Sequence, residues 1–391
     1  MGANLLAVRS HNTALVLDLL RGAGAEGISR LELAERTGLT PQAVSKITAR
    51  LREEGFAAEA GRRASTGGKP RTVLRLVPEA GHAVGVHLDR DELRVVLVDL
   101  DGAVVGERRG VVDLGGDAET VLGLVAGEVT GLVEEVLGSR GGGEDRRGDE
   151  DEGEDRREDE GDGGRELGEF GSLLGVGVAL PGPLDHARGV LHRVTGFPEW
   201  EGFPLRDALA ERLGVPVVVD KDTNAAALGL SVRGEGGSFA YLHLGTGLGA
   251  GLVIGGRVHR GTRTGAGEFG HQVIQLDGPP CECGDRGCME ALCLAAVARG
   301  EAEEAARVLG VGAGNLVGLL DIDLVLLGGR TIASAPEAYV HGVAEVLAAR
   351  ARREGLPGET VPVRVAPGGE RGVAEGAAQL LLAPVFGRAG S

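Results

Sequence analysis

Apolar residues recur at helical spacing near the start of the chain. Residues 11–21 (HNTALVLDLLR) place most of their leucines on one side of a helix. Ser29 and Glu32 have the spacing of a capping box, so a second helix is expected to begin there. Gly38 suits the left-handed position that ends a helix. The pattern predicts two short helices joined by a turn.

A third helix follows at once. Thr40 is a good N-cap, Pro41 suits the first helical position, and Gly55 ends the segment. Its apolar face is expected to consist of Val44, Ile47 and Leu51. Its outer face is expected to carry Gln42, Ser45, Lys46, Thr48 and Arg50. Two helices joined by a glycine turn, the second with a polar outer face, are typical of a helix-turn-helix motif.

Residues 56–60 and 72–77 can pair as a hairpin behind these helices. The tip carries the basic residues Arg62, Arg63, Lys69 and Arg71, which suit phosphates or a minor groove. Residues 1–78 are therefore predicted to form a winged helix-turn-helix DNA-binding domain. Its expected DNA contacts are Thr40, Gln42, Ser45, Lys46 and Arg50, together with the four basic tip residues. The alternative is a three-helix protein-interaction domain with a solvated basic loop.

Charge is unevenly distributed along the chain. The whole sequence has 41 basic and 58 acidic residues, a net charge of −17 that by itself argues against a nucleic-acid partner. Residues 1–77, however, have 12 basic against 7 acidic residues, and residues 140–169 have 6 against 14. Residues 138–168 contain one apolar residue, Leu167, and are predicted to be a disordered surface insertion. A tolerated insertion is favoured over a regulatory or DNA-mimicking role.

The composition excludes some classes of protein. The sequence contains no run of about 18 uncharged apolar residues, so no membrane span is predicted. The first 20 residues contain Arg9, His11 and Asp18 and lack a signal-peptide pattern, so a cytoplasmic protein without a membrane partner is expected. Four cysteines in 391 residues do not make a disulfide framework.

Two stretches share one layout of three strands. Residues 83–107 and 239–259 each alternate as strand, turn, strand, turn and strand, and helices and further strands follow each. Two such halves with a cleft between them predict an α/β, actin-like (ribonuclease-H-like) two-lobed fold. The second turn, at 244–251 (LGTGLGAG), can aim backbone N–H groups at an anion. The first turn lacks glycine, and its Asp89 and Asp91 would repel phosphates.

The strongest local signal is a cluster of metal-ligand residues. His271, Cys281, Cys283 and Cys288 follow the spacing H-x9-C-x-C-x4-C. One imidazole and three thiolates predict a closed, structural zinc site, because no position is left open for water. The alternative is a group of buried free cysteines. Cys293 falls on the following helix and is expected in the core.

Carboxylates lie near this cluster. Asp222 precedes a helix, Glu268 precedes the zinc histidine by three residues, and Glu290 follows the last cysteine ligand. Carboxylates accept hydrogen bonds from neighbouring hydroxyls, so a sugar or another polyol is the expected ligand. The alternatives are that Asp222 only caps its helix and that Glu268 and Glu290 are solvated.

Over nearly the whole chain the sequence resembles the ROK family of repressors and sugar kinases. The matching motifs are ALPGPLD (179–185), PEWEGFPL (198–205), VDKDTNAAALG (219–229), LGTGLGAG (244–251), GEFGH (267–271) and CECGDRGCME (281–290). The winged helix is similar to that of the family's repressors of xylose and N-acetylglucosamine genes. The resemblance implies that Asp222 stands at the kinases' catalytic-base position and that Glu268, His271 and Glu290 contact sugar hydroxyls. It also implies a first lobe over 79–181, completed by a helix at about 370–391, and a second lobe over 182–369 with a zinc knuckle at 271–288.

Four departures from the family pattern bear on function. The segment 87–91 (HLDRD) replaces the kinases' Asp-x-Gly-Gly-Thr phosphate loop, so neither ATP nor Mg²⁺ is expected to bind and no catalytic residue is assigned. Lys221 replaces the Asn before Asp222, Gly196 replaces another Asn, and a helical piece is missing between Glu290 and Asp323. Lys221 either pairs with Asp222 or meets an anionic ligand group, and the second interpretation favours a sugar phosphate over a neutral sugar.

The combined prediction is a sugar-responsive regulator without enzyme activity, a repressor of carbohydrate uptake or catabolism genes. A homodimer or homotetramer would bind a palindromic double-stranded operator, with recognition helices about 34–36 Å apart. The effector-binding residues are expected to be Lys221, Asp222, Glu268, His271 and Glu290. The alternatives are a sugar kinase with an accessory DNA-binding domain and a regulator whose pocket binds nothing.

Overall fold

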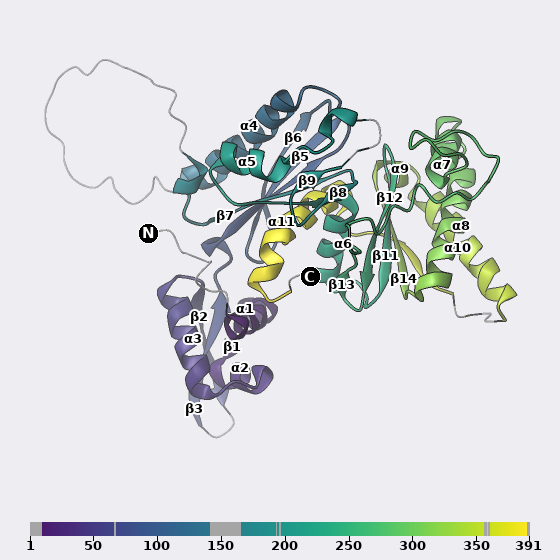
Figure 1. The fold of residues 1–391 in the computed structure, drawn as a ribbon. Helices are drawn as coiled ribbons and strands as arrows, with labels where there is room; N and C mark the ends of the chain where they lie inside the picture. Colours follow the sequence, from purple (N-terminus) through teal and green to yellow (C-terminus); the bar gives the residue numbers. More distant parts are fainter. Residues whose placement is uncertain are drawn as a thin grey trace, which may run out of the picture.

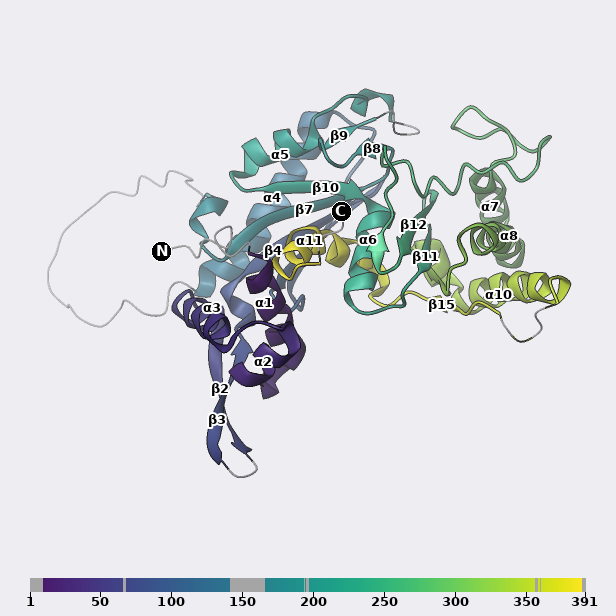
Figure 2. The same ribbon diagram turned by 60° about the horizontal axis from the view of Figure 1, so that its bottom comes forward.

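The structure is a computed structural model that describes residues 10–65, 68–140, 166–192, 194, 197–355, 358 and 360–388. Figures 1 and 2 show an amino-terminal head (residues 10–77) and two lobes, each built on a five-stranded sheet. We call the two lobes together the body. None of the helices in the described ranges is long and apolar enough to cross a membrane.

The head consists of three helices and a three-stranded antiparallel sheet. Its elements are α1 (His11–Ala23), β1 (Ile28–Ser29), α2 (Arg30–Thr37), α3 (Pro41–Glu53), β2 (Ala57–Ser65) and β3 (Gly68–Leu76), with strand order β1-β3-β2. The backbone N–H of Glu32 donates to Ser29 Oγ and the N–H of Ser29 donates to Glu32 Oε2, which confirms the capping box. Thr40 caps α3 by accepting from the N–H of Ala43.

One position on α3 differs from the expected pattern. Thr48 is fully buried instead of lying on the outer face. Its hydroxyl donates to the carbonyl oxygen of Val44 at 2.9 Å and accepts from Arg30 Nε at 3.2 Å. Thr48 follows Val44 by four residues, so the two share a helix face, and that face is directed into the head. Ile47 is only partly buried.

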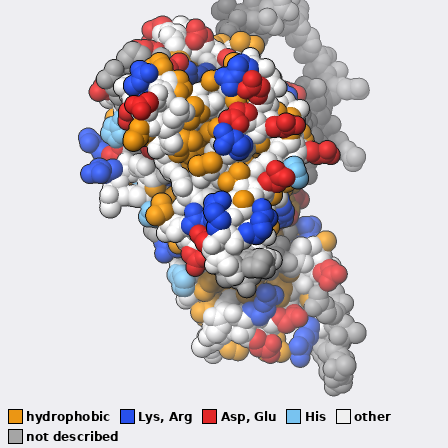
Figure 3. Space-filling view, turned by 90° about the vertical axis from the view of Figure 1, so that its right-hand side faces the viewer, with side chains coloured by type: hydrophobic (Ala, Val, Ile, Leu, Met, Phe, Trp, Pro, Cys, Tyr) orange, Lys and Arg blue, Asp and Glu red, His pale blue; other side chains and the backbone are white. Residues whose placement is uncertain are grey.

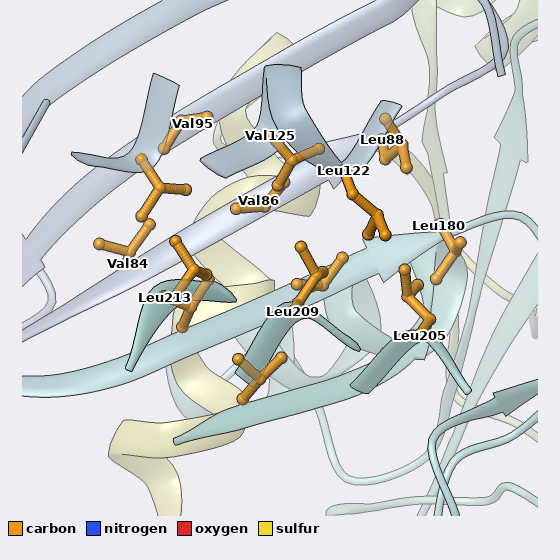
Figure 4. Packing of buried hydrophobic residues seen from close by; sticks show 14 of the residues in the cluster. Val84, Val86, Leu88, Val95, Leu122, Val125, Leu180, Leu205, Leu209 and Leu213 are labelled. Atoms are coloured by element: carbon orange, nitrogen blue, oxygen red, sulfur yellow. The ribbon is translucent and has the colours of Figure 1, made fainter. Parts of the chain in front are cut away.

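The sheet of the first lobe has the strand order β10-β7-β4-β5-β6. These strands are β4 (His82–Leu88), β5 (Glu92–Asp99), β6 (Val104–Val111), β7 (Leu173–Leu180) and β10 (Val217–Lys221). α4 (Ala118–Leu137) and α5 (Leu205–Leu213) cover one face, and Figure 4 shows their apolar side chains packed on Val86 of β4 and Leu180 of β7. α11 (Gly372–Val385) covers the other face. A small ribbon of β8 (Leu184–Asp185) and β9 (Val190–Leu191) adjoins this lobe.

The first lobe reaches further along the chain than the expected boundary at residue 181. β10 pairs in parallel with β7, with Val217 opposite Val176 and Lys221 opposite Leu180. The apolar residues of α5 and β10 belong to the first lobe's core. Residues 182–221 are therefore part of the first lobe, because the strand that follows α5 joins the first sheet and not the second.

The acidic stretch 138–168 lies between α4 and β7. Gly138–Arg140 forms a short 3₁₀ turn, and Leu167 is buried in the core of the first lobe. The expected disorder therefore does not extend to these two ends. Residues 141–165, on which the rest of that prediction falls, lie outside the described residues.

The sheet of the second lobe has the strand order β13-β12-β11-β14-β15. Its strands are β11 (Phe239–Leu244), β12 (Leu248–Ile254), β13 (Arg257–Val258), β14 (Leu324–Gly328) and β15 (Val363–Val365). The helices of this lobe are α6 (Asp222–Val232), α7 (Met289–Ala298), α8 (Ala302–Leu320), α9 (Arg330–Ser334) and α10 (Pro336–Arg353). Side chains alternate along β11, so Ala240 packs towards α7, α8 and α10, whereas Tyr241 packs towards α6.

Two helices join the parts of the molecule. α6 lies against the second sheet and α11 against the first, and the two helices pack on each other between the sheets (Figures 1 and 2). One hydrophobic cluster combines Leu17 and Leu20 of α1 with Val96 of β5 and with Leu382 and Phe386 at the end of α11. The head therefore shares a core with the first lobe.

Candidate ligand cavity, metal cluster and DNA-binding face

Asp222 is placed at the start of α6, directly after β10 (Val217–Lys221). The N–H of Thr223 donates to Asp222 Oδ1 at 2.6 Å. Burial raises the pKa of Asp222 to about 7, against the effect of this N–H donor, and the nearby carboxylate of Asp89 adds to the rise. A carboxyl group with this pKa can accept or donate a hydrogen bond near neutral pH.

Lys221 is buried and pairs with Glu268, not with Asp222 as one interpretation of the sequence had it. Its Nζ lies 2.9 Å from Glu268 Oε1 and 2.6 Å from the carbonyl oxygen of Ala266. The pairing with Asp222 is wrong because Glu268 and the Ala266 carbonyl take up the ammonium of Lys221, whereas Asp222, the first residue of α6, accepts from the N–H of Thr223. A Cβ at Gly182 would lie 2.6 Å from Lys221 Cδ, so the glycine makes room for the lysine stem.

Glu290, near the start of α7, is tied to the glycine-rich turn before β12. Its Oε2 accepts from the N–H of Leu248 at 2.8 Å, and its Oε1 lies 4.0 Å from His271 Nδ1. A Cβ at Gly247 would lie 3.1 Å from Glu290 Oε2. The turn therefore uses its glycine and its backbone N–H to hold a carboxylate of the protein itself.

The structure brings the five expected effector-binding residues together around one cavity between the lobes. Its lining includes Lys221, Asp222, Glu268, His271 and Glu290. Asp89 and Arg90 of the first lobe and Thr246 of the second complete the polar part of the wall. Gly196, which replaces an Asn of the family pattern, lies outside the described residues.

Two acidic residues of the first lobe bridge the cleft to the second lobe. Thr246 Oγ1 donates to Asp89 Oδ1 at 2.9 Å, and Arg330 at the start of α9 donates to Asp91 Oδ2 through both Nη atoms, at 3.0 and 3.1 Å. Burial alone would raise the pKa of Asp89, but His87 and the donors around the carboxylate outweigh it and lower the pKa. These hydrogen bonds pair Thr246 with Asp89 and Arg330 with Asp91 across the cleft.

Sequence reasoning missed a pair of histidines beside the cavity. His87 is the last residue but one of β4 and His243 the last but one of β11, at matching positions in the two halves (AVGVHL and FAYLHL). Their rings meet edge to face with centroids 6.3 Å apart. Tyr241 OH and His243 Nδ1 are 2.9 Å apart. Burial lowers the pKa of His87 to about 4, so this ring is neutral. The repeated histidine in two apolar strands was the available signal.

The four predicted metal ligands meet at one point. The ligand atoms of His271, Cys281, Cys283 and Cys288 all lie within 4.8 Å of one another. Cys281 Sγ is 3.7 Å from His271 Nδ1, and Cys283 Sγ is 3.6 Å from Cys288 Sγ. Their chemistry, one imidazole and three thiols, fits a metal ion held by four protein atoms. Cys293 lies apart, buried in the core of the second lobe as expected.

The expected DNA contacts on α3 are presented on one side of the head. Thr40, Gln42, Ser45 and Lys46 are exposed. Arg50 is less free, because its Nη2 donates to Thr13 Oγ1 at 2.9 Å. Of the four basic residues predicted at the hairpin tip, Arg71 on β3 is exposed. Arg62 and Arg63 fall on β2 and Lys69 on β3; their side chains lie outside the described part of the structure.

The comparisons with known proteins agree with this architecture. Residues 165–298 match the ROK family and residues 16–56 match a winged helix-turn-helix DNA-binding domain. The xylose repressor of Caldicellulosiruptor bescii is 28% identical over 266 residues, which cover 67% of this chain and 59% of that protein. The DNA-binding transcriptional dual regulator NagC of Escherichia coli K12 is 30% identical over 296 residues, which cover 74% of this chain and 64% of NagC. The chain thus spans about three-fifths of the length of these relatives.

A solved structure is similar over almost the full chain. A ROK family transcriptional regulator, described as a homologue of the E. coli MLC protein, superposes with a TM-score of 0.71 and covers 97% of this chain and 98% of its own. At 20% identity this likeness shows the fold. The chain thus carries a ROK family domain, matched over residues 165–298, and a winged helix-turn-helix domain ahead of it, matched over residues 16–56.

Proposed function

We propose that the chain is a sugar-responsive, DNA-binding transcriptional repressor of carbohydrate uptake or catabolism genes. The observation that carries the proposal is the shared hydrophobic cluster of α1, β5 and α11, which packs the proposed DNA-binding head directly on the body that contains the candidate ligand cavity. Because the two parts share a core, a movement of the body changes the position of the head. The names of the two sequence relatives, a xylose repressor and a DNA-binding regulator, support the same function.

In this proposal α3 enters the major groove and the wing contacts the backbone or the minor groove. Gln42, Ser45 and Lys46 would face the bases or phosphates, because their side chains are exposed beside the α3 N-terminus. A homodimer would place two heads on a palindromic operator. Figure 3 shows hydrophobic side chains among charged ones on the outer face of the second lobe; this face is our proposed dimer contact. Leu319 of α8, a helix of the same lobe, is 78% exposed.

The charge of the cavity favours a neutral sugar over the sugar phosphate that Lys221 first suggested. The ammonium of Lys221 is already countered by Glu268. Asp89, Asp222 and Glu290 line the same cavity, and its other cation, Arg90, lies 3.6 Å from Glu282. An anionic ligand would therefore meet more acidic groups than unpaired cations. A sugar hydroxyl can instead donate to Asp222 and to the free lone pairs of Glu268 and Glu290.

We propose that the chain does not transfer phosphoryl groups. In such a reaction the nucleotide phosphates need donors and metal ions, whereas here Thr246 and Arg330 are bonded to Asp89 and Asp91. A phosphate would have to displace these contacts and would meet two carboxylates. A coupled assay with ATP and a panel of hexoses tests this point, and turnover of about 1–100 s⁻¹, the range of kinases, would contradict it.

We propose that the metal held by His271 and the three cysteines is structural Zn²⁺. Four protein ligands leave no position for a water nucleophile. The ion would fix the loop that carries His271 beside Glu290 and Glu268 on the cavity wall. Removal of the metal would then weaken ligand binding as well as stability.

Fluorescence anisotropy tests the proposed function directly. The full chain is titrated onto labelled DNA from upstream of its own gene, with and without D-xylose, D-glucose, N-acetylglucosamine and their phosphates. Specific binding that one neutral sugar relieves supports the proposal. Specific binding that no compound changes favours a pocket that binds nothing. Absence of specific binding contradicts the proposal that the chain is a DNA-binding regulator.

A further inference from the structure

Helix α6 connects the candidate ligand cavity with the joint between body and head. Its first residue, Asp222, lines the cavity, and its last residue is Val232. The carbonyl oxygen of Val232 accepts a hydrogen bond from Arg388 Nη1 at 3.0 Å. The same guanidinium donates to both carboxylate oxygens of Asp18 on α1, at 3.0 and 3.3 Å. Arg388 therefore contacts α6 of the body and α1 of the head at once.

The backbones of α6 and α11 are in direct contact. A Cβ at Gly229 would lie 3.0 Å from Gly376 Cα, and a Cβ at Gly376 would lie 2.1 Å from the carbonyl oxygen of Ala225. Close-packed surfaces transmit strain, and at these two glycines the helices meet through backbone atoms and not through flexible side chains. A displacement of α6 is therefore passed to α11 and to the residues that follow it, which include Arg388.

The head rests on the end of α11. Leu382 and Phe386 pack in one cluster with Leu17 of α1. The guanidinium carbon of Arg21 lies 4.1 Å from the centre of the Phe386 ring, a cation–π contact. The orientation of α1, and with it the position of the head, thus depends on where α11 and Arg388 lie.

We propose that Arg388 is a positioning residue that couples ligand binding in the cavity to the orientation of the DNA-binding head. A ligand held by Asp222 moves the start of α6, and the bond from Arg388 to Val232 carries that movement to Asp18. The inference rests on the proposed function, since it concerns the response of DNA binding to a sugar. The side chains of Arg388 and Asp18 are 42% and 29% exposed, so solvent screens the pair and it adds little to stability.

The first test compares ligand response in the full chain and in Arg388→Ala. A sugar that releases the wild type is expected to change its DNA affinity about 5–150-fold, the usual range of allosteric coupling. Arg388→Ala is expected to bind DNA and sugar about as tightly as the wild type when each is measured alone, with a response below about threefold. Asp18→Asn should behave in the same way. The control is Arg307→Ala, which removes a guanidinium that pairs instead with Glu304 on α8. A wild-type response in Arg388→Ala overturns the inference.

The second test needs neither DNA nor a known ligand. Hydrogen exchange of α1 amides is measured in wild type, Asp222→Asn, Arg388→Ala and the double variant. The change at Asp222 is expected to alter α1 exchange when Arg388 is present and to leave it unaltered when Arg388 is absent. Equal effects of Asp222→Asn in both backgrounds overturn the inference. If the wild type fails to bind DNA but this dependence on Arg388 is found, the proposed function fails and the coupling stands.

Discussion

Replacing Asp222 by Asn measures what its ionised carboxylate costs the folded protein. Burial, opposed by the Thr223 N–H and reinforced by Asp89, raises the pKa of Asp222 from 3.8 to about 7. Each pKa unit corresponds to about 1.4 kcal/mol of differential stabilisation. The ionised side chain therefore lowers the free energy of unfolding by about 4 kcal/mol at most.

The pH dependence follows from the direction of this shift. A carboxyl group whose pKa is raised keeps its proton in the folded state at pH values where the unfolded chain has released it. From about pH 4 to about pH 7 the wild type therefore loses about 1.4 kcal/mol of stability per pH unit relative to a neutral side chain, and above pH 7 the loss stays constant. The stability advantage of Asp222→Asn should grow over this window and then level off.

Urea unfolding followed by circular dichroism at intervals from about pH 4 to pH 8 measures this difference. The matched control is Asp207→Asn, which changes an exposed carboxylate on α5 and should track the wild type to within about 0.5 kcal/mol. An advantage of Asp222→Asn that is the same at both ends of the range, or that shrinks as pH rises, would refute the argument that burial controls this carboxyl group.

Affinity for a neutral sugar is expected to rise as pH passes upward through about 7, because the ionised form of Asp222 is the stronger hydrogen-bond acceptor. An affinity that calorimetry finds unchanged over this pH range contradicts the expectation. Cys283→Ser removes one of four ligands, so bound zinc, measured by mass spectrometry after dialysis, should fall from about one equivalent per chain to well below half. Lys46→Ala should weaken DNA binding about equally on all sequences and reduce the salt slope by about 1; a loss confined to one operator base pair would assign Lys46 to base readout instead.

The sequence predicted those parts of the fold whose signals are local. The capping box at Ser29, the start of α3 at Thr40 and the metal spacing depend on residues a few positions apart, and the structure has each of them. The expected exposure of Thr48 followed from its polarity, whereas its four-residue spacing from the buried Val44 places it on the buried face of α3. A buried hydroxyl can return its hydrogen bond to the preceding turn, as this one does.

The sequence predicted which residues line the cavity but not how they pair with one another. All five expected effector-binding residues line it, because the motifs that carry them lie at strand ends and turns that face the same cleft. The partner of Lys221 is 47 positions away, and no spacing rule connects Lys221 with Glu268. The place of β10 in the first sheet could not be predicted either, because strand pairing across a crossover is decided by packing and not by the strand's own sequence.

The central place of α11 bears on how the protein acquires its structure during synthesis. The first sheet is built mostly from residues 82–180 and 217–221, yet one of its faces is covered by residues 372–385. On the ribosome that face, and the apolar side of α1 that belongs to the same cluster, stay uncovered until translation has passed residue 385. The helices of the head can form early, since their caps are local, whereas their docking must wait for contacts of very long sequence separation. Nascent chains halted before α11 would present this apolar surface to chaperones and to one another.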